Sequence, residues 1–190
     1  ALTNALNNWL GGMSGASAVI LGIVLGLMMC SDLGGPINKA AYLFATTNLA
    51  VTNVGSLKVM AAVMAAGMVP PLAMALSTTL RPKLYQPAER ENGTAAWLLG
   101  ASFISEGAIP FAAADPLRVI PSMMVGGATT GALSMALGAA SKAPHGGIFV
   151  FFAIDRVWAF ILAIVVGTLV AALLVTALKA SARRKAAAAA

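Results

Sequence analysis

The sequence has few charged residues for its length. Only 9% of its 190 residues are charged, whereas soluble domains carry about 25%. Hydrophobic residues make up 59%, and the mean hydropathy is +0.88. Uncharged runs cover residues 1–31, 40–57, 59–80, 119–141 and 157–178, and about 20 apolar residues are enough to cross the hydrocarbon core as a helix. The composition excludes a water-soluble domain and predicts an all-α polytopic membrane protein.

The sequence also lacks the residue sets of self-contained catalytic chemistry. It has one cysteine, Cys30, which excludes a disulfide framework and a cysteine metal cluster. It has one histidine, His145, and no HExxH, Walker or GxSxG motif. We therefore expect no catalytic residue, no metal and no cofactor in this chain. Residues 1–15 lack a basic region and a cleavage site, so they predict the interior of a longer protein rather than a signal peptide.

The net charge is +6, and seven of the twelve basic residues lie in two clusters, within Arg81–Gly93 and within Lys179–Lys185. In a soluble protein such a charge would suggest nucleic acid, but basic residues beside apolar spans set membrane orientation. We expect no nucleic-acid partner and place both clusters on the cytoplasmic side, with Arg81–Gly93 as a loop. Two full crossings, at residues 123–140 and 157–178, would then separate them.

Two apolar segments predict membrane helices, the first of them packed inside protein. Gly22 and Gly26, within the first segment at residues 14–30, have the small-xxx-small spacing that lets helices approach closely. Pro70 and Pro71 lie in the middle of the span at residues 58–80, where neighbouring helices can satisfy the carbonyls that a proline leaves free. We expect a kink there.

Other segments are too short or too polar to span. Residues 40–53, 95–111 and 146–154 predict re-entrant hairpins, broken helices or surface segments. The first two each precede a full span, so the two halves of the chain share a plan. Short segments interrupted by Gly and Pro in corresponding halves indicate a transporter binding site.

Glu106 is the foremost candidate for ligand binding. It lies in an apolar segment at a predicted helix break, and a carboxylate inside a membrane is by default functional. Its two oxygens could accept two hydroxyl protons of a sugar. The alternative is a helix cap at the membrane surface.

Polar residues near other breaks are weaker candidates. Asp32 and Asn38 flank a Gly-Gly-Pro turn that could expose backbone amides to a ligand. Equally, Asp32 could cap a helix while Lys39 extends to the interface. His145 precedes two glycines and could contact a sugar hydroxyl or relay a proton, or it could be satisfied by the backbone. Asp115 and Arg118 predict a structural pair at a helix start, outside the site.

Three blocks carry a resemblance to a known family: DLGGPINKAAYLF (Asp32–Phe44), GASFISEGAIPFAAADPLRVIPS (Gly100–Ser122) and APHGGIFV (Ala143–Val150). In this order, they resemble the fructose-family enzyme IIC, the membrane component of the bacterial phosphoenolpyruvate-dependent sugar phosphotransferase system. The resemblance covers nearly the whole chain. It implies a glucose-superfamily-like fold and a multi-pass location in the bacterial inner membrane.

The resemblance also implies a function. Such a component translocates fructose or a related hexose, while a partner enzyme IIB phosphorylates the sugar from a phosphocysteine; the chain itself would carry no phosphoryl group. The run Ile104-Ser105-Glu106-Gly107 looks like the glutamate motif of related glucose permeases. Glu106, with Ser105 and Gly107, therefore joins Asp32, Asn38 and His145 as the expected sugar site.

The same resemblance sets expectations for the whole protein. Residues 1–180 would be the later, substrate-binding part of a permease domain, the preceding half absent, and residues 181–190 a cytoplasmic tail. The full-length protein would be a homodimer in contact with lipid. Two other readings stay open: a proton-coupled secondary transporter with Glu106 as proton carrier, and a membrane scaffold whose polar breaks only shape helices.

Overall fold

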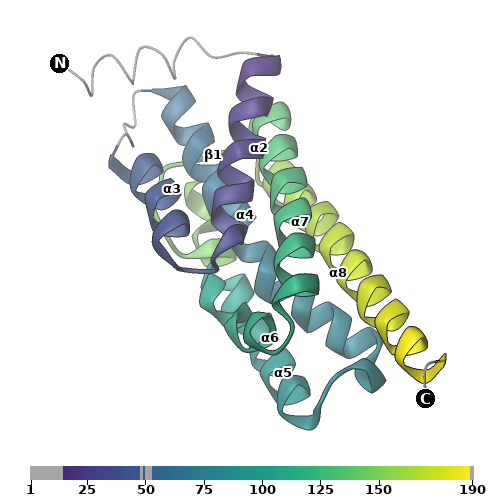
Figure 1. Cartoon of the computed structure of the whole chain (residues 1–190). Coiled ribbons are helices and arrows are strands. Elements are labelled where there is room, and N and C mark those ends of the chain that lie inside the picture. Colours follow the sequence, from purple (N-terminus) through teal and green to yellow (C-terminus); the bar gives the residue numbers. More distant parts are fainter. Residues whose placement is uncertain (1–14, 48, 50–52, 189–190) are drawn as a thin grey trace.

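The computed structural model describes residues 15–47, 49 and 53–188, which form an elongated, almost wholly helical bundle (Figure 1). Residues 1–14, for which the sequence predicts no signal peptide, lie outside the described residues. The elements are α2 (Ala16–Ser31), α3 (Pro36–Thr47), α4 (Val54–Leu80), η1 (Pro82–Leu84), α5 (Pro87–Ala101), η2 (Ser105–Ala108), α6 (Ile109–Ala114), α7 (Pro116–Leu137), β1 (Ala140–Ser141), η3 (Gly147–Ala153), β2 (Ile154–Asp155) and α8 (Val157–Ala188).

Three of the described helices are long and apolar enough to cross a membrane: α4, α7 and α8. They match the predicted spans. α4 is the central helix, since α2, α5, α7 and α8 all pack against it and its most apolar stretch is 89% buried. α2 is apolar but only 16 residues long, and α3 has 12 residues, too few to span.

Facing glycines hold α2 against α7. Gly22 faces Gly131 and Gly26 faces Gly127, and a Cβ on any of the four would overlap a backbone carbonyl of the other helix. In a membrane, where lipid tails are as apolar as side chains, close backbone approach is a main source of helix association. The close packing predicted from Gly22 and Gly26 is confirmed.

α4 continues through its two prolines because other segments satisfy the carbonyls they free. Pro70 and Pro71 have no N–H, which leaves the carbonyls of Ala66 and Gly67 without partners within the helix. The Cys30 thiol of α2 donates to Ala66 O at 3.4 Å. In the same way, the Ser105 hydroxyl of η2 donates to Gly67 O at 2.7 Å. The two prolines therefore fix where α2 and η2 dock on α4.

The polar stretch Arg81–Gly93 is more helical than the sequence suggested. It was expected to be a loop, but it forms η1 and then the first two turns of α5. Pro87 opens α5 with a fixed φ, and the Gln86 N–H donates to Glu89 Oε2 at 2.8 Å in a capping box. Local capping thus outweighs the polar composition. α8 also continues as a helix to Ala188, over most of the basic tail.

The two basic clusters meet at one end of the molecule. Lys179 Nζ lies 3.6 Å from Glu89 Oε1, and the Arg183 guanidinium donates to the carbonyl of Lys83. An even number of long helices, α7 and α8, separates them. The two clusters therefore lie at the same end of the molecule, and their place on the cytoplasmic side stays a prediction.

Candidate functional site

Asp32 closes the turn that starts α3. Its Oδ2 accepts the Ile37 N–H at 2.7 Å and its Oδ1 accepts the Asn38 N–H at 2.9 Å. Both carboxylate oxygens therefore satisfy donors of the first helical turn, which have no intrahelical partner. The Asn38 side chain donates to Met29 O at 2.6 Å, which fixes α3 against the end of α2.

The C-terminal end of α5 fixes the position of Phe103. After α5, Ile104 N–H donates to Leu99 O at 2.9 Å and Phe103 N–H to Gly100 O at 3.1 Å, the bonding of a Schellman motif. The motif places Phe103 in the left-handed region, with φ of 64°, where glycine is usual. Its ring lies against Gly67 of α4, where a Cβ would overlap it.

Glu106 follows on η2, held by neighbours on either side. The buried Ser105 hydroxyl anchors the element to α4. Gly107 is buried, and a Cβ there would lie 3.0 Å from the side chain of Leu99. The Glu106 carboxylate lies against the turn before α3, because a Cβ on Gly34 would be 2.6 Å from its Oε1. Gly34 also has a φ of 102°, so this position favours glycine on two grounds.

His145 reaches the same place from a hairpin between α7 and α8. The two-residue strands β1 and β2 pair antiparallel and close this loop. Gly147 has a φ of 59°, and a Cβ there would lie 2.9 Å from Phe103 N. Without a side chain the loop packs directly onto the end of α5.

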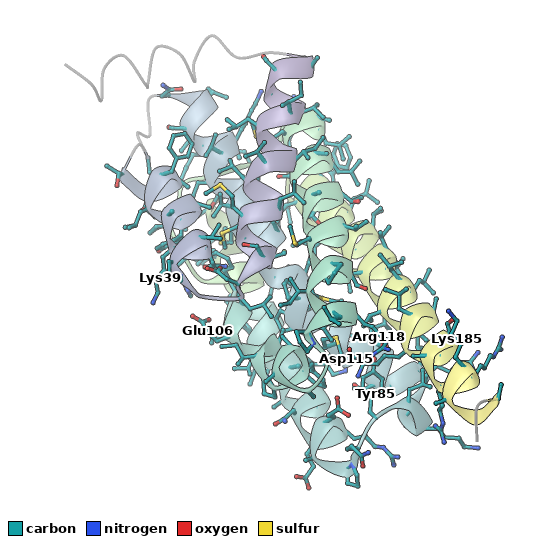
Figure 2. The ribbon with its side chains drawn as sticks, in the orientation of Figure 1. Lys39, Tyr85, Glu106, Asp115, Arg118 and Lys185 are labelled. Carbon is teal, nitrogen blue, oxygen red and sulfur yellow. The ribbon has the colours of Figure 1, made fainter. Side chains whose placement is uncertain are left out.

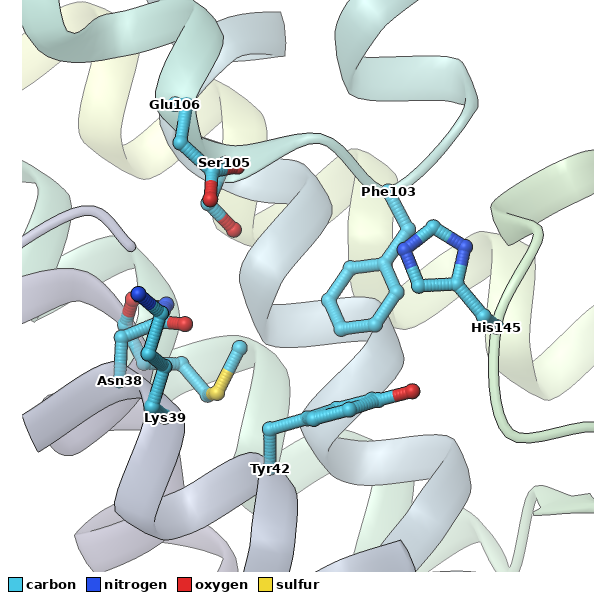
Figure 3. A pocket seen from close by; sticks show the side chains of 8 residues that line it. Asn38, Lys39, Tyr42, Phe103, Ser105, Glu106 and His145 are labelled. Atoms are coloured by element: carbon cyan, nitrogen blue, oxygen red, sulfur yellow. The ribbon is translucent and has the colours of Figure 1, made fainter. Parts of the chain in front are cut away.

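These segments line a cavity of about 210 Å³ that is open on one side (Figure 3). At about 30 Å³ per water, it has room for about seven waters, the scale of a small polar ligand. Figure 3 shows Glu106 and Ser105 on one side, Asn38, Lys39 and Tyr42 on a second, and His145 on a third. The lining residues are Met29, Asn38, Lys39, Tyr42, Phe103, Ser105, Glu106 and His145.

Four of the six predicted site residues line this cavity: Asn38, Ser105, Glu106 and His145. Asp32 and Gly107 do not: the Asp32 carboxylate caps α3, and Gly107 lets η2 pack on α5.

Part of the lining was not predicted from the sequence. Tyr42, Phe103, Lys39 and Met29 were not among the candidates, although all but Met29 lie within the blocks that carry the resemblance. Their spacing offers one usable signal, since Lys39 and Tyr42 are three residues apart on one face of α3.

The cavity has a wall of aromatic rings and two side chains of opposite charge, Lys39 and Glu106. The ring centroids of Phe103 and His145 are 5.0 Å apart, and Tyr42 lies 6.0 Å from Phe103 and 6.3 Å from His145. Glu106 makes no ion pair with any described residue, and no group of three metal-ligating residues occurs in residues 15–47 and 53–188. An apolar wall with a few polar groups is typical of small-molecule sites.

A separate cluster of charges lies at the end where α5, α7 and α8 meet (Figure 2). Lys179 Nζ is 3.5 Å from Asp115 Oδ2 and lies over the Tyr85 ring at 4.8 Å. Arg118 pairs with Asp115 at 2.9 Å, which confirms the predicted pair. Burial raises the pKa of Tyr85 to about 12, and the carboxylates of Glu89 and Asp115 add to this shift. None of these residues lines the cavity, and Figure 2 shows Tyr85, Asp115 and Arg118 away from Lys39 and Glu106.

The fold and the cavity together define a class: a polytopic α-helical membrane protein with a polar pocket where its helices are broken. The chain is 54% identical over 181 residues to the fructose-specific EIIB'BC component of a PTS system from Escherichia coli, covering 94% of this chain and 32% of that protein. It is 50% identical over 178 residues to a fructose-specific EIIC component from Haloferax volcanii, covering 94% and 46%. It is also 44% identical to a fructose permease IIC component from Bacillus amyloliquefaciens, covering 94% and 58%.

Over most of its length the chain is therefore homologous to part of proteins named as fructose-specific EIIC and EIIB'BC components, which agrees with the resemblance predicted from the sequence. It spans about a third of the length of the Escherichia coli relative and under three fifths of the Bacillus amyloliquefaciens one. No protein-family profile and no solved structure matches it.

Proposed function

We propose that this chain provides the sugar-binding part of a fructose permease of the phosphotransferase system. The proposal rests mainly on one observation: segments far apart in the sequence bring Asn38, Glu106 and His145 to one small polar cavity. The names of the relatives support it, since they are fructose-specific components and a fructose permease.

In this proposal each lining group has a role set by its chemistry. The Glu106 carboxylate has no ion-pair partner among the described residues, so both its oxygens can accept sugar hydroxyls. Lys39 and His145 supply donors, and Asn38 keeps its amide oxygen as an acceptor after its Nδ2 has donated to Met29 O. The rings of Tyr42 and Phe103 pack on the C–H faces of the sugar.

The whole protein would couple this binding to phosphorylation. A partner enzyme IIB would transfer its phosphoryl group to a hydroxyl of the bound sugar, so this chain holds the acceptor and carries no phosphoryl group itself. Relatives named EIIB'BC and EIIABC, from Escherichia coli and Bacillus subtilis, support an EIIB partner. A bacterial inner-membrane location and a homodimer complete the proposal.

Substituting Glu106 tests the proposal. In the full-length permease, Glu106→Gln should weaken fructose binding about ten- to hundredfold, because hydrogen bonds to a charged group contribute about 1.5–3 kcal/mol. The measurement is fructose affinity between pH 5.5 and 8 for wild type and variant. Glu91→Gln is the matched control, since Glu91 is exposed on α5 and lines a different cavity.

The outcomes separate the proposal from proton coupling. A proton carrier keeps its affinity in the Gln variant, because glutamine resembles the protonated acid, and loses the pH dependence of transport. Near-wild-type affinity of Glu106→Gln would remove Glu106 from the sugar site.

A further inference from the structure

A second cavity lies at the end of the molecule where the two basic clusters meet, away from the cavity that Glu106 lines. It has a volume of about 530 Å³ and is formed by η1, the start of α5 and the end of α8. Figure 2 shows this end through Tyr85 and Lys185. Lys83, Arg90 and Arg183 line it, and no acidic side chain does. Its charge suits an anion.

Backbone carbonyls hold the two guanidinium groups in place. Arg90 Nε donates to Tyr85 O at 3.2 Å, and Arg183 Nη1 donates to Lys83 O. Each group thereby uses one of its five N–H donors and leaves the others for a ligand. Both carbonyls belong to residues 83–85, at the end of η1, so the arginines of α5 and α8 hydrogen-bond the same short segment.

The nearby carboxylates are engaged elsewhere. Glu89 accepts the Gln86 N–H at 2.8 Å and lies 3.6 Å from Lys179 Nζ, while Asp115 contacts Arg118 and Lys179. No ion pair neutralises Lys83, Arg90 or Arg183 within the described part of the chain. Planar guanidinium groups bind phosphate oxygens two at a time, which makes phosphate the best-matched anion.

The surroundings indicate where such a phosphate comes from. The cavity lies just beyond the apolar part of two long helices, where Leu80 at the end of α4 is 57% exposed. Farther along α8, Leu169 and Leu173 are 45% and 63% exposed. A ligand with a phosphate and apolar tails would match the cavity and this surface together. Basic pockets between helices at the membrane surface bind lipid headgroups in this way.

We propose that Lys83, Arg90 and Arg183 form a binding site for the phosphate of an anionic phospholipid headgroup. The bound lipid would join α5 to α8 at the end where the two basic clusters meet. This site is separate from the proposed sugar cavity, and it stands whether or not that cavity binds fructose.

Native mass spectrometry of the full-length protein tests the proposal by measuring binding of phosphatidylglycerol and phosphatidylcholine. Wild type should bind phosphatidylglycerol at least about tenfold more tightly than phosphatidylcholine. The double variant Arg90→Gln/Arg183→Gln should bind phosphatidylglycerol about thirtyfold more weakly, because it removes both planar guanidinium groups that line the cavity and hydrogen-bond the phosphate oxygens. Arg184→Gln/Lys185→Gln removes the same charge outside the cavity and should change binding less than about twofold.

A conservative variant and competing ligands complete the test. Arg183→Lys retains the charge but loses the planar fork, so it should bind phosphatidylglycerol with intermediate affinity even if the double variant fails to fold. Equal weakening in both double variants, or equal affinity for the two lipids, would overturn the site. Displacement of the lipid by millimolar inorganic phosphate or by a phosphoserine peptide, with the same arginine dependence, would show a site for soluble phosphate or for a phosphorylated protein.

Discussion

At the scale of single residues, Phe103 has a strained backbone conformation that places its ring in the cavity wall. A left-handed backbone conformation costs a non-glycine residue about 1–2 kcal/mol, and Phe103 occupies one at a helix end where glycine would be relaxed. Its ring, 5% exposed, fills the space above Gly67 and forms the wall of the cavity with His145. Strain of this kind concentrates at functional sites. The ring therefore completes the cavity wall, which a glycine at this position could not do.

This backbone conformation predicts an inverted order of stability at position 103. Phe103→Gly and Phe103→Ala both lose the ring, but the glycine variant should be more stable by about 1 kcal/mol, because alanine keeps the backbone strain. Unfolding temperatures in one detergent compare the two variants. Phe111, a fully buried phenylalanine on α6 without a positive φ, is the control and should show the usual order, with alanine the more stable. The same order at both positions would contradict the account of Phe103.

Tyr85 predicts a dependence of stability on alkaline pH. Burial raises its pKa from about 10 to about 12, so the folded state holds the phenol proton more tightly than the unfolded state does. The stability linked to this proton is complete below pH 10 and is lost as the pH rises to 12, by at most about 1.4 kcal/mol per unit. Tyr85→Phe should remove that part of the slope. Parallel stability curves of wild type and variant between pH 9 and 11.5 would show that Tyr85 does not titrate as described.

At the scale of elements, the prolines of α4 act as docking points. Pro71 frees the carbonyl of Gly67, and Ser105 donates to it; η2, which carries Glu106, is thereby attached to the central helix. Pro70 and Cys30 repeat the arrangement for α2. A proline in a buried helix thus becomes a specific attachment site, because a buried carbonyl without a partner would cost about 1–3 kcal/mol.

A double-mutant cycle tests this docking. Ser105→Ala should destabilise the protein by about 1–3 kcal/mol, since it leaves Gly67 O without a donor. In a Pro71→Ala background the helix supplies its own N–H, and the same change should cost under about 0.5 kcal/mol. The pair Cys30→Ala and Pro70→Ala is the matched comparison and should couple less, because a thiol is a weak donor. Additive effects of Ser105→Ala and Pro71→Ala would show that the hydrogen bond does not attach η2.

At the scale of the whole molecule, the sequence revealed the spans and the breaks but not how the breaks meet. Apolar length located α4, α7 and α8, and the spacing of Gly22 and Gly26 predicted the contact of α2 with another helix. The sequence could not show whether Asp32 binds a ligand or caps a helix. Only the structure shows that both its carboxylate oxygens accept hydrogen bonds from backbone N–H groups of α3. Phe103 was missed because its exposure to the cavity follows from one backbone angle, which residue type does not encode.

The central claim is that α3, η2 and the hairpin before α8 surround one sugar, and thiol labelling tests it most directly. The native Cys30 is 0% exposed, so once any cysteines outside this chain are replaced by serine, single cysteines at Lys39 or at His145 in the full-length permease should react alone. Fructose above its measured dissociation constant should slow both reactions with a small maleimide, about tenfold at nine-tenths occupancy. A cysteine at Lys142, exposed on the same hairpin and outside the cavity, should react at an unchanged rate. Protection at neither Lys39 nor His145, with fructose bound, would contradict the account.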